Sequence, residues 1–129
     1  MAQILIVDDE PETIRLLARI ISLLQHDPLE ASSGEQALSF LQLGMPHLIL
    51  LDLMMPEMDG YEVMRRIRAR PEGRNVPIVV VTASPEVDVE ERVREAGGNA
   101  VYFKPIGMAM LTEAINNHIH TGDTAPLAA

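Results

Sequence analysis

Two hydrophobic patterns alternate along this chain, one typical of buried strands and the other typical of helices that cover a sheet. Short continuous apolar runs are expected for parallel strands that are buried on both faces. The runs at 3–7, 47–51, 77–82 and 100–103 fit this description, and 28–32 is a weaker candidate. The pattern therefore predicts five strands.

Between these runs, apolar residues recur with the spacing of a helix face. Ile14, Leu17 and Ile21 fall at such positions and predict a helix from Pro11 to about Leu24. A capping box, formed by Ser32 with Glu35 or by Ser33 with Gln36, predicts the start of a second helix that contains Ala37, Leu38 and Leu41. The three remaining helices are predicted at 60–70, from Ser84-Pro85 to Gly97-Gly98, and from Met108 to Ile119.

The alternation of strands and helices predicts the fold class. Five strands separated by helices favour a parallel sheet covered on both faces, with right-handed crossovers, and hence an α/β fold. A chain of 129 residues has the length of one domain. Residues 121–129 are rich in small and polar residues, and we expect them to form a tail or the start of a linker.

Composition narrows the classes of function. The chain has no cysteine, which excludes disulfides, thiolate metal sites and cysteine catalysis. Its net charge of −9 argues against nucleic-acid binding, which needs a basic surface. The N-terminus lacks the basic region of a signal peptide, and no apolar stretch approaches the roughly 20 residues of a membrane span. We therefore expect a cytoplasmic protein with no direct contact to membranes.

Polar side chains follow four of the five predicted strands. Asp8 and Asp9 come after the first, Asp52 after the third, Thr82 ends the fourth, and Lys104 follows the fifth. Ligands of open α/β sheets bind at the carboxyl ends of the strands, so these side chains are expected to meet there. Taken singly, each has a plainer explanation, such as a helix cap or a solvated lysine. Their coincidence at matching strand ends favours a functional site.

This set of residue types points to phosphoryl chemistry. Three neighbouring carboxylates repel one another, and a hard divalent cation relieves that repulsion. Mg²⁺ suits one or two carboxylates together with water and a phosphate oxygen. A carboxylate can act as a nucleophile and form an aspartyl phosphate, while an ammonium group and a hydroxyl stabilise the phosphoryl oxygens. The residues predict a magnesium-assisted acyl-phosphate site.

Four stretches of the chain resemble the receiver domain of bacterial two-component response regulators. They are ILIVDDE at 4–10, LILLDLMMPEMDGYEV at 48–63, PIVVVTA at 77–83 and FKPI at 103–106. The resemblance covers about residues 2 to 120, which makes 1–120 the receiver domain. It implies a doubly wound, flavodoxin-like sheet with the strand order 2-1-3-4-5. It also implies a signalling switch that takes a phosphoryl group from a sensor histidine kinase or a histidine phosphotransfer protein.

The resemblance also implies roles for individual residues. Asp52 corresponds to the phosphoryl acceptor. Asp8 and Asp9 correspond to the acidic pair that places Mg²⁺, and Met54 to the position whose backbone carbonyl ligates the metal, together with Asp52.

Two further residues correspond to the groups that respond to phosphorylation. Thr82 matches the switch hydroxyl, and Lys104 matches the lysine that pairs with the phosphate. The peptide bond between Lys104 and Pro105 matches one that is cis in the family. Such a domain catalyses its own phosphorylation and dephosphorylation, but acts mainly as a switch for a downstream protein target or a phosphorelay.

One position departs from the family pattern. The family usually has an aromatic residue three places before the lysine, where this chain has Val101. Tyr102 is one place later, and one step along a strand points to the opposite face. We expect a switch that works without the usual aromatic ring.

Other functions were weighed against this one. A haloacid-dehalogenase-like phosphatase would need a second aspartate at position 54, where the chain has methionine. No glycine-rich phosphate loop follows a strand, so nothing supports nucleotide binding. The main alternative is a degenerate receiver that binds proteins without being phosphorylated. Kinase, pathway and output stay open, as does the question of a single-domain regulator or a part of a longer protein.

Overall fold

Five parallel strands form the central sheet, in the order β2-β1-β3-β4-β5, as the resemblance implied. The computed structural model describes residues 2–124, and side chains up to residue 119. The elements are β1 (Gln3–Val7), α1 (Pro11–Leu23), β2 (Asp27–Ala31), α2 (Gly34–Leu41), β3 (Leu48–Leu51), α3 (Gly60–Arg68), the 3-10 turn η1 (Pro71–Gly73), β4 (Ile78–Thr82), α4 (Val89–Ala96), β5 (Ala100–Phe103) and α5 (Met108–Thr124).

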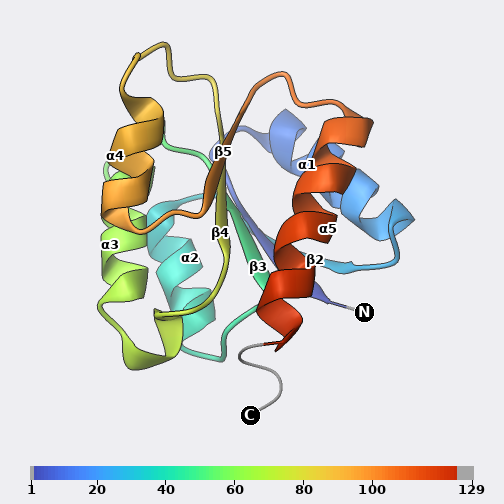
Figure 1. Ribbon diagram of the computed structural model, residues 1–129, viewed down its shortest axis with the longest axis horizontal. Coiled ribbons are helices and arrows are strands. Elements are labelled where there is room, and N and C mark those ends of the chain that lie inside the picture. Colours follow the sequence, from blue (N-terminus) through green and yellow to red (C-terminus); the bar gives the residue numbers. More distant parts are fainter. Residues whose placement is uncertain (1, 125–129) are drawn as a thin grey trace.

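Helices cover both faces of the sheet and divide the core in two (Figure 1). One cluster of buried side chains joins α2, α3 and α4 to the sheet, and the other joins α1 and α5 to the opposite face. All four residues of β3 and all five of β4 are buried. Burial on both faces explains why these strands appear in the sequence as unbroken apolar runs.

The edge strands differ from the central ones. In β2 only Ala31 is fully buried, and in β5 no residue is. An edge strand has a neighbour on one side only, so its sequence needs fewer apolar residues. This is why 28–32 gave a weak signal, and the strand lies one residue earlier than expected, at 27–31.

Side-chain caps fix the starts of the helices α2 and α3. Ser33 caps α2 by accepting a hydrogen bond from the Gln36 amide, while the Gln36 side chain accepts one from the Ser32 amide. This decides between the two capping boxes in favour of Ser33 and Gln36. Asp59 caps α3 by accepting from the Glu62 amide.

Two predicted helix ends are wrong. We expected α4 to begin at Ser84-Pro85, but it begins at Val89. The side chain of Val89 is buried whereas that of Val87 is fully exposed, so residues 84–88 lack an apolar anchor against the sheet. The helix α5 continues to Thr124, beyond residue 120 where we expected a tail, because each added residue closes one more backbone hydrogen bond. The rest of that tail, 125–129, lies outside the described residues.

Membrane insertion was not expected from the sequence. Within residues 2–124, none of the helices has both the length and the apolar character needed to cross a bilayer.

Candidate functional site

The carboxyl ends of three strands bring two aspartates and a lysine together. Val7 and Leu51 are partners in the register of β1 and β3, so Asp8 and Asp52, which follow them, leave the sheet side by side. The Asp52 amide donates to the Val7 carbonyl at 2.9 Å, which extends the pairing of the strands by one residue. The convergence that the strand ends predicted is therefore present.

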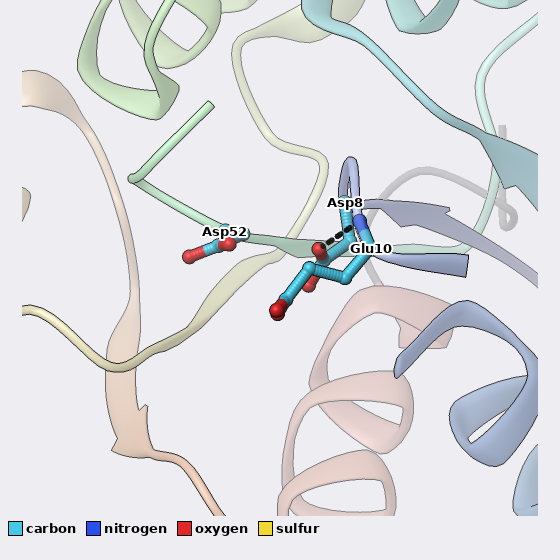
Figure 2. A group of neighbouring side chains, drawn as sticks. All are labelled: Asp8, Glu10 and Asp52. Carbon is cyan, nitrogen blue, oxygen red and sulfur yellow. Dashed lines mark hydrogen bonds between the residues drawn. The ribbon is translucent and has the colours of Figure 1, made fainter. Parts of the chain in front are cut away.

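Three carboxylates form a cluster at this edge. Oxygen atoms of Asp8, Glu10 and Asp52 lie within 4.8 Å of one another (Figure 2). The side chains of Asp8 and Asp52 are almost fully buried, at 3% and 5% exposure, whereas that of Glu10 is 62% exposed. The Glu10 amide donates to Asp8 Oδ1 at 2.9 Å, which fixes the turn between β1 and α1.

Glu10 was not among the predicted site residues, and Asp9 is not in the cluster. The run DDE at 8–10 holds three carboxylates, and the first two were the predicted metal ligands. Glu10 is the residue before α1, but its carboxylate caps no backbone amide of the helix and instead accepts from the Thr13 hydroxyl at 3.3 Å and from Lys104 Nζ at 3.0 Å. Asp9 is exposed and borders a cavity of about 230 Å³. The cavity is lined by Asp9, Glu10, Asp52, Met54, Ala83 and Lys104.

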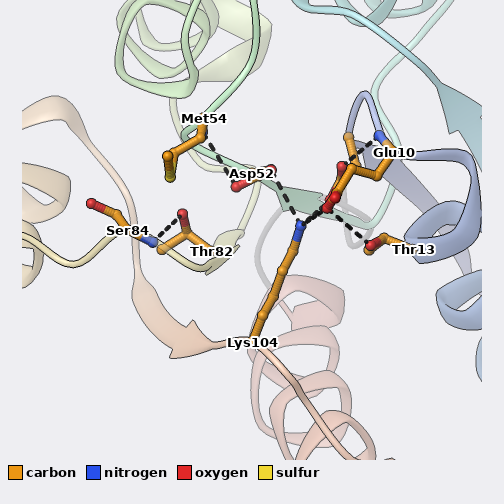
Figure 3. A network of polar contacts seen from close by, with 8 residues as sticks. Glu10, Thr13, Asp52, Met54, Thr82, Ser84 and Lys104 are labelled. Carbon is orange, nitrogen blue, oxygen red and sulfur yellow. Dashed lines mark hydrogen bonds and ion pairs between the residues drawn. The ribbon is translucent and has the colours of Figure 1, made fainter.

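The ammonium group of Lys104 lies among the three carboxylates (Figure 3). Lys104 Nζ is 2.8 Å from Asp8 Oδ2, 3.0 Å from Glu10 Oε1 and 3.3 Å from Asp52 Oδ2. All three donors of the ammonium group are thereby used. One cation thus faces three acidic groups.

Burial and the neighbouring charges shift the pKa values of Asp8 and Lys104. Burial raises the pKa of Asp8 above its ordinary value, and the charge of Asp52 acts in the same direction, while Lys104 only partly offsets them. Burial works against the charged form of Lys104, yet hydrogen bonds to Asp8 and Glu10 hold its pKa above the ordinary value. The charged form of Lys104 is therefore favoured by its carboxylate partners, whereas the charged form of Asp8 is disfavoured mainly by its burial.

The loop after Asp52 is shaped by a close backbone approach. The Met54 amide donates to Asp52 Oδ1 at 3.3 Å, and the Gly60 amide donates to the Leu53 carbonyl at 3.0 Å. A side chain at Gly60 would place its Cβ 2.4 Å from the Asp52 carbonyl oxygen, so only glycine fits there. The Met54 side chain is 55% exposed and lines the cavity.

Thr82 is fully buried on the neighbouring strand β4. Its hydroxyl oxygen accepts a hydrogen bond from the Ser84 amide at 3.2 Å (Figure 3). In this structure the Thr82 hydroxyl therefore contacts the loop beyond β4 rather than the carboxylates.

The two residues before Phe103 point to opposite faces of β5, as expected. Val101 packs with the cluster under α2, α3 and α4, whereas Tyr102 packs with the cluster under α1 and α5. The expected cis peptide bond between Lys104 and Pro105 is also present.

The donor set fits a hard divalent cation. All the candidate ligand atoms are carboxylate oxygens, and the two buried carboxylates leave negative charge that Lys104 does not balance. Mg²⁺ prefers such oxygen ligands and keeps several waters, for which the adjoining cavity has room. Any such ion would compete with Lys104 for Asp8 and Asp52.

Comparison with known proteins identifies relatives over nearly the whole chain. The family model of the response regulator receiver domain matches residues 4–116. The probable transcriptional regulator ycf27 of Porphyridium aerugineum is 34% identical over 95% of this chain, which covers 50% of that protein. The polar-differentiation response regulator DivK of Brucella ovis is 31% identical, with 90% of this chain covering 94% of DivK.

A solved structure with the same fold holds a magnesium ion. The receiver domain of the sensor histidine kinase PA1611 from Pseudomonas aeruginosa, with a magnesium ion coordinated in its active site cleft, is 31% identical with a TM-score of 0.85. The match covers 92% of this chain and 98% of that one. Since this chain spans only half of ycf27 and 26% of a probable cyclic di-GMP phosphodiesterase of Vibrio cholerae, some relatives carry it as one part of a longer protein.

Proposed function

Because the chain belongs to the response regulator receiver family, we propose that it is a phosphorylation switch in which Asp52 accepts the phosphoryl group. The observation that carries this proposal is the buried carboxylate of Asp52 at a strand end, 3.3 Å from Lys104 and beside the surplus charge of Asp8. A carboxylate with no catalytic task would be costly to keep there.

The reaction forms one bond and breaks another at phosphorus. An oxygen of the Asp52 carboxylate attacks the phosphorus atom, and the bond from phosphorus to the donor breaks, with its electron pair leaving on the donor. From a phosphohistidine the leaving group is the imidazole nitrogen, and from acetyl phosphate it is acetate. Hydrolysis of the aspartyl phosphate by water later restores the carboxylate and releases phosphate.

The metal ion that this chemistry calls for has ligands at hand. We assign Mg²⁺ to Asp8, Asp9, Asp52 and the backbone carbonyl of Met54, where it would neutralise charge between the carboxylates and the phosphoryl oxygens. Glu10, which lies in the cluster, is a further candidate for the outer ligands.

The chain's own groups stabilise the product. Lys104 gives up part of its contact with the carboxylates and pairs with a phosphoryl oxygen. The hydroxyl of Thr82 turns from the Ser84 amide toward Asp52 and donates to another phosphoryl oxygen. These two movements carry the state of Asp52 to the surface around α4, β5 and α5.

The phosphodonor and the target are further parts of the proposal. We expect the donor to be a sensor histidine kinase or a histidine phosphotransfer protein, in the cytoplasm, and the output to be the binding of a target protein or the passing on of the phosphoryl group. DivK, a response regulator of nearly the same length, supports a single-domain role. The ycf27 match supports a role within a longer protein.

Intact-mass measurement tests the proposal. Incubation with acetyl phosphate and Mg²⁺ is expected to give a phosphate adduct, which disappears without Mg²⁺ and in Asp52→Asn. Asp27→Asn, a change of an exposed aspartate on the edge strand β2, is the matched control and keeps the adduct. An adduct that persists in Asp52→Asn contradicts the assignment. No adduct in the wild type, with kinases tested too, favours the degenerate binding module.

A further inference from the structure

The loop of residues 83–88, between β4 and α4, is tied to the site at its first end. The Ser84 amide donates to the Thr82 hydroxyl oxygen at 3.2 Å (Figure 3). The Glu86 amide lies 3.5 Å from the Ser84 hydroxyl oxygen. Ala83 lines the cavity beside Asp52. The position of this loop therefore depends on the orientation of the Thr82 hydroxyl.

The same loop is tied to α3 and α4 at its second end. Glu86 Oε1 lies 2.8 Å from Arg92 Nη1 on α4. The Arg92 guanidinium in turn lies over the ring of Tyr61 on α3, 4.3 Å from the ring centroid. Tyr61 is 7% exposed and belongs to the core, so it offers Arg92 a fixed platform.

The ion pair between Glu86 and Arg92 is weak enough to form and break reversibly. The side chains of Arg92 and Glu86 are 42% and 52% exposed, and an ion pair in such a setting contributes little free energy. The contact with the Tyr61 ring adds a similarly small amount. A tie of this strength biases the position of the loop without locking it.

We propose that Glu86 and Arg92 form a latch that holds loop 83–88 in its resting position and so opposes the turn of Thr82 toward a phosphorylated Asp52. This inference rests on the proposed function. When the Thr82 hydroxyl turns to a phosphoryl oxygen, its oxygen leaves the Ser84 amide and the loop must follow. Release of the latch is part of that movement, so the latch lowers the affinity of the protein for the phosphorylated arrangement. Arg92 is a positioning residue that acts through the loop and Thr82.

Titration with beryllofluoride, a mimic of the phosphoryl group, measures this effect. In the presence of Mg²⁺, the half-saturating beryllofluoride concentration is followed by the amide resonances of Thr82 and Ser84. Arg92→Gln and Glu86→Gln are each expected to lower it about two- to fivefold, as fits the loss of one exposed ion pair. The double variant is expected to match the single ones, because both changes remove the same contact.

A second ion pair provides the matched control. Arg66 and Glu62 on α3 are also 2.8 Å apart and similarly exposed, and neither residue takes part in the Glu86–Arg92 ion pair. Arg66→Gln is therefore expected to leave the half-saturating concentration unchanged. Arg92→Lys can still pair with Glu86 and cover Tyr61. Its half-saturating beryllofluoride concentration is therefore expected to stay close to that of the wild type.

A measurement without any ligand separates the latch from general stability. Hydrogen exchange of the Ser84 amide is expected to quicken in Arg92→Gln, while the thermal midpoint stays close to that of Arg66→Gln. Unchanged or weaker beryllofluoride binding in both latch variants would overturn the latch. If those variants still form the aspartyl phosphate by intact mass, the proposed function stands; if the wild type forms none, the proposed function itself fails.

Discussion

Lys104 and Arg68 are both partly buried cations that donate hydrogen bonds to several oxygen atoms. They lie at opposite ends of the sheet, and their oxygen partners differ in charge. Lys104, at the carboxyl ends of the strands, meets the carboxylates of Asp8, Glu10 and Asp52. Arg68, at the end of α3, meets only neutral acceptors. They are the carbonyls of Gly97, Gly73 and Val76, at 2.9, 2.8 and 2.7 Å, and the side-chain oxygen of Asn99 at 3.1 Å.

The difference separates a site that can exchange partners from one that cannot. Carboxylates can release an ammonium group and bind a metal ion instead, because negative charge is in surplus at that end. Backbone carbonyls near Arg68 have no such alternative, and Arg68 joins the end of α3, the turn η1 and the starts of β4 and β5. We interpret the Lys104 end as the working end of the sheet and the Arg68 end as its fixed base.

The largest effect is expected from a substitution of Arg68 at the fixed base of the sheet. Arg68→Met leaves three carbonyls without their donor, and we expect the free energy of unfolding to fall by about 2–4 kcal/mol. Urea denaturation at pH 7 measures it. Arg66→Met, which removes only an exposed ion pair on the same helix, should cost no more than about 0.5 kcal/mol. Equal losses in the two variants would show that the carbonyl contacts of Arg68 have no special weight.

The next largest effect is expected from removing a charge at the working end. Asp8→Asn is expected to stabilise the metal-free protein by about 1.5 kcal/mol at pH 7, because it removes a buried charge and, to a smaller extent, its repulsion from Asp52. It should also abolish the rise in thermal midpoint that Mg²⁺ gives to the wild type. Asp27→Asn is the control and should change neither quantity. A less stable Asp8→Asn protein would mean that the pairing with Lys104 outweighs the cost of the buried charge.

The sign of the pH dependence follows from the same shift. The pKa of Asp8 is raised in the folded state above its ordinary 3.8, so the folded protein binds a proton there more readily than the unfolded chain does. The penalty from the charged form is therefore present at neutral pH and disappears as the pH falls through the raised value. The stability advantage of Asp8→Asn should shrink between pH 7 and pH 4 in urea titrations, and an advantage that grows would refute the assignment.

A smaller effect sharpens the description of the working end. Met54 presents a thioether to the cavity, which orients an attacking water poorly. Met54→Asn is expected to speed loss of the phosphoryl group three- to fivefold, or about 0.7–1 kcal/mol of activation free energy. The decay of the phosphate adduct by intact mass, after the donor is removed, gives the rate. Met110→Asn, at an equally exposed methionine outside the cavity lining, should decay like the wild type. Slower or unchanged decay in Met54→Asn would contradict this role.

The smallest effect is expected from Tyr102, whose ring should take no part in the switch. Tyr102 packs against the α1 and α5 side of the sheet, away from the side on which Val101 lies. We expect structures with and without beryllofluoride to show the Tyr102 ring in place, and Tyr102→Leu to bind beryllofluoride within about twofold of the wild type. A swing of the ring toward Thr82 would show that the switch uses this aromatic after all.

Much of the fold could be predicted because burial leaves a direct trace in the sequence. The central strands β1, β3 and β4 are buried on both faces and appear as apolar runs. The edge strand β2 and the start of α4 were placed less well, because their limits depend on tertiary contacts. Ser84-Pro85 looks like a helix start, yet the first buried anchor comes only at Val89.

The candidate site could be predicted only in part. Asp8, Asp52 and Lys104 follow strands, and the geometry of a parallel sheet makes such residues converge. Glu10 was missed because its place depends on a side chain that reaches across to Lys104. The Arg68 cluster was missed because its acceptors are mostly backbone carbonyls, which every residue has and no sequence pattern marks.

The most direct test of the central claim is to locate the phosphoryl group. The protein is phosphorylated with acetyl phosphate and Mg²⁺, the acyl phosphate is reduced with borohydride, and the peptides are mapped by mass spectrometry. We expect one reduced residue, Asp52, with Asp8 and Glu10 unmodified although they lie within 4.8 Å of it. Reduction at Asp8 or Glu10 instead, or a phosphoryl group on a histidine, would contradict the assignment of Asp52 as the acceptor.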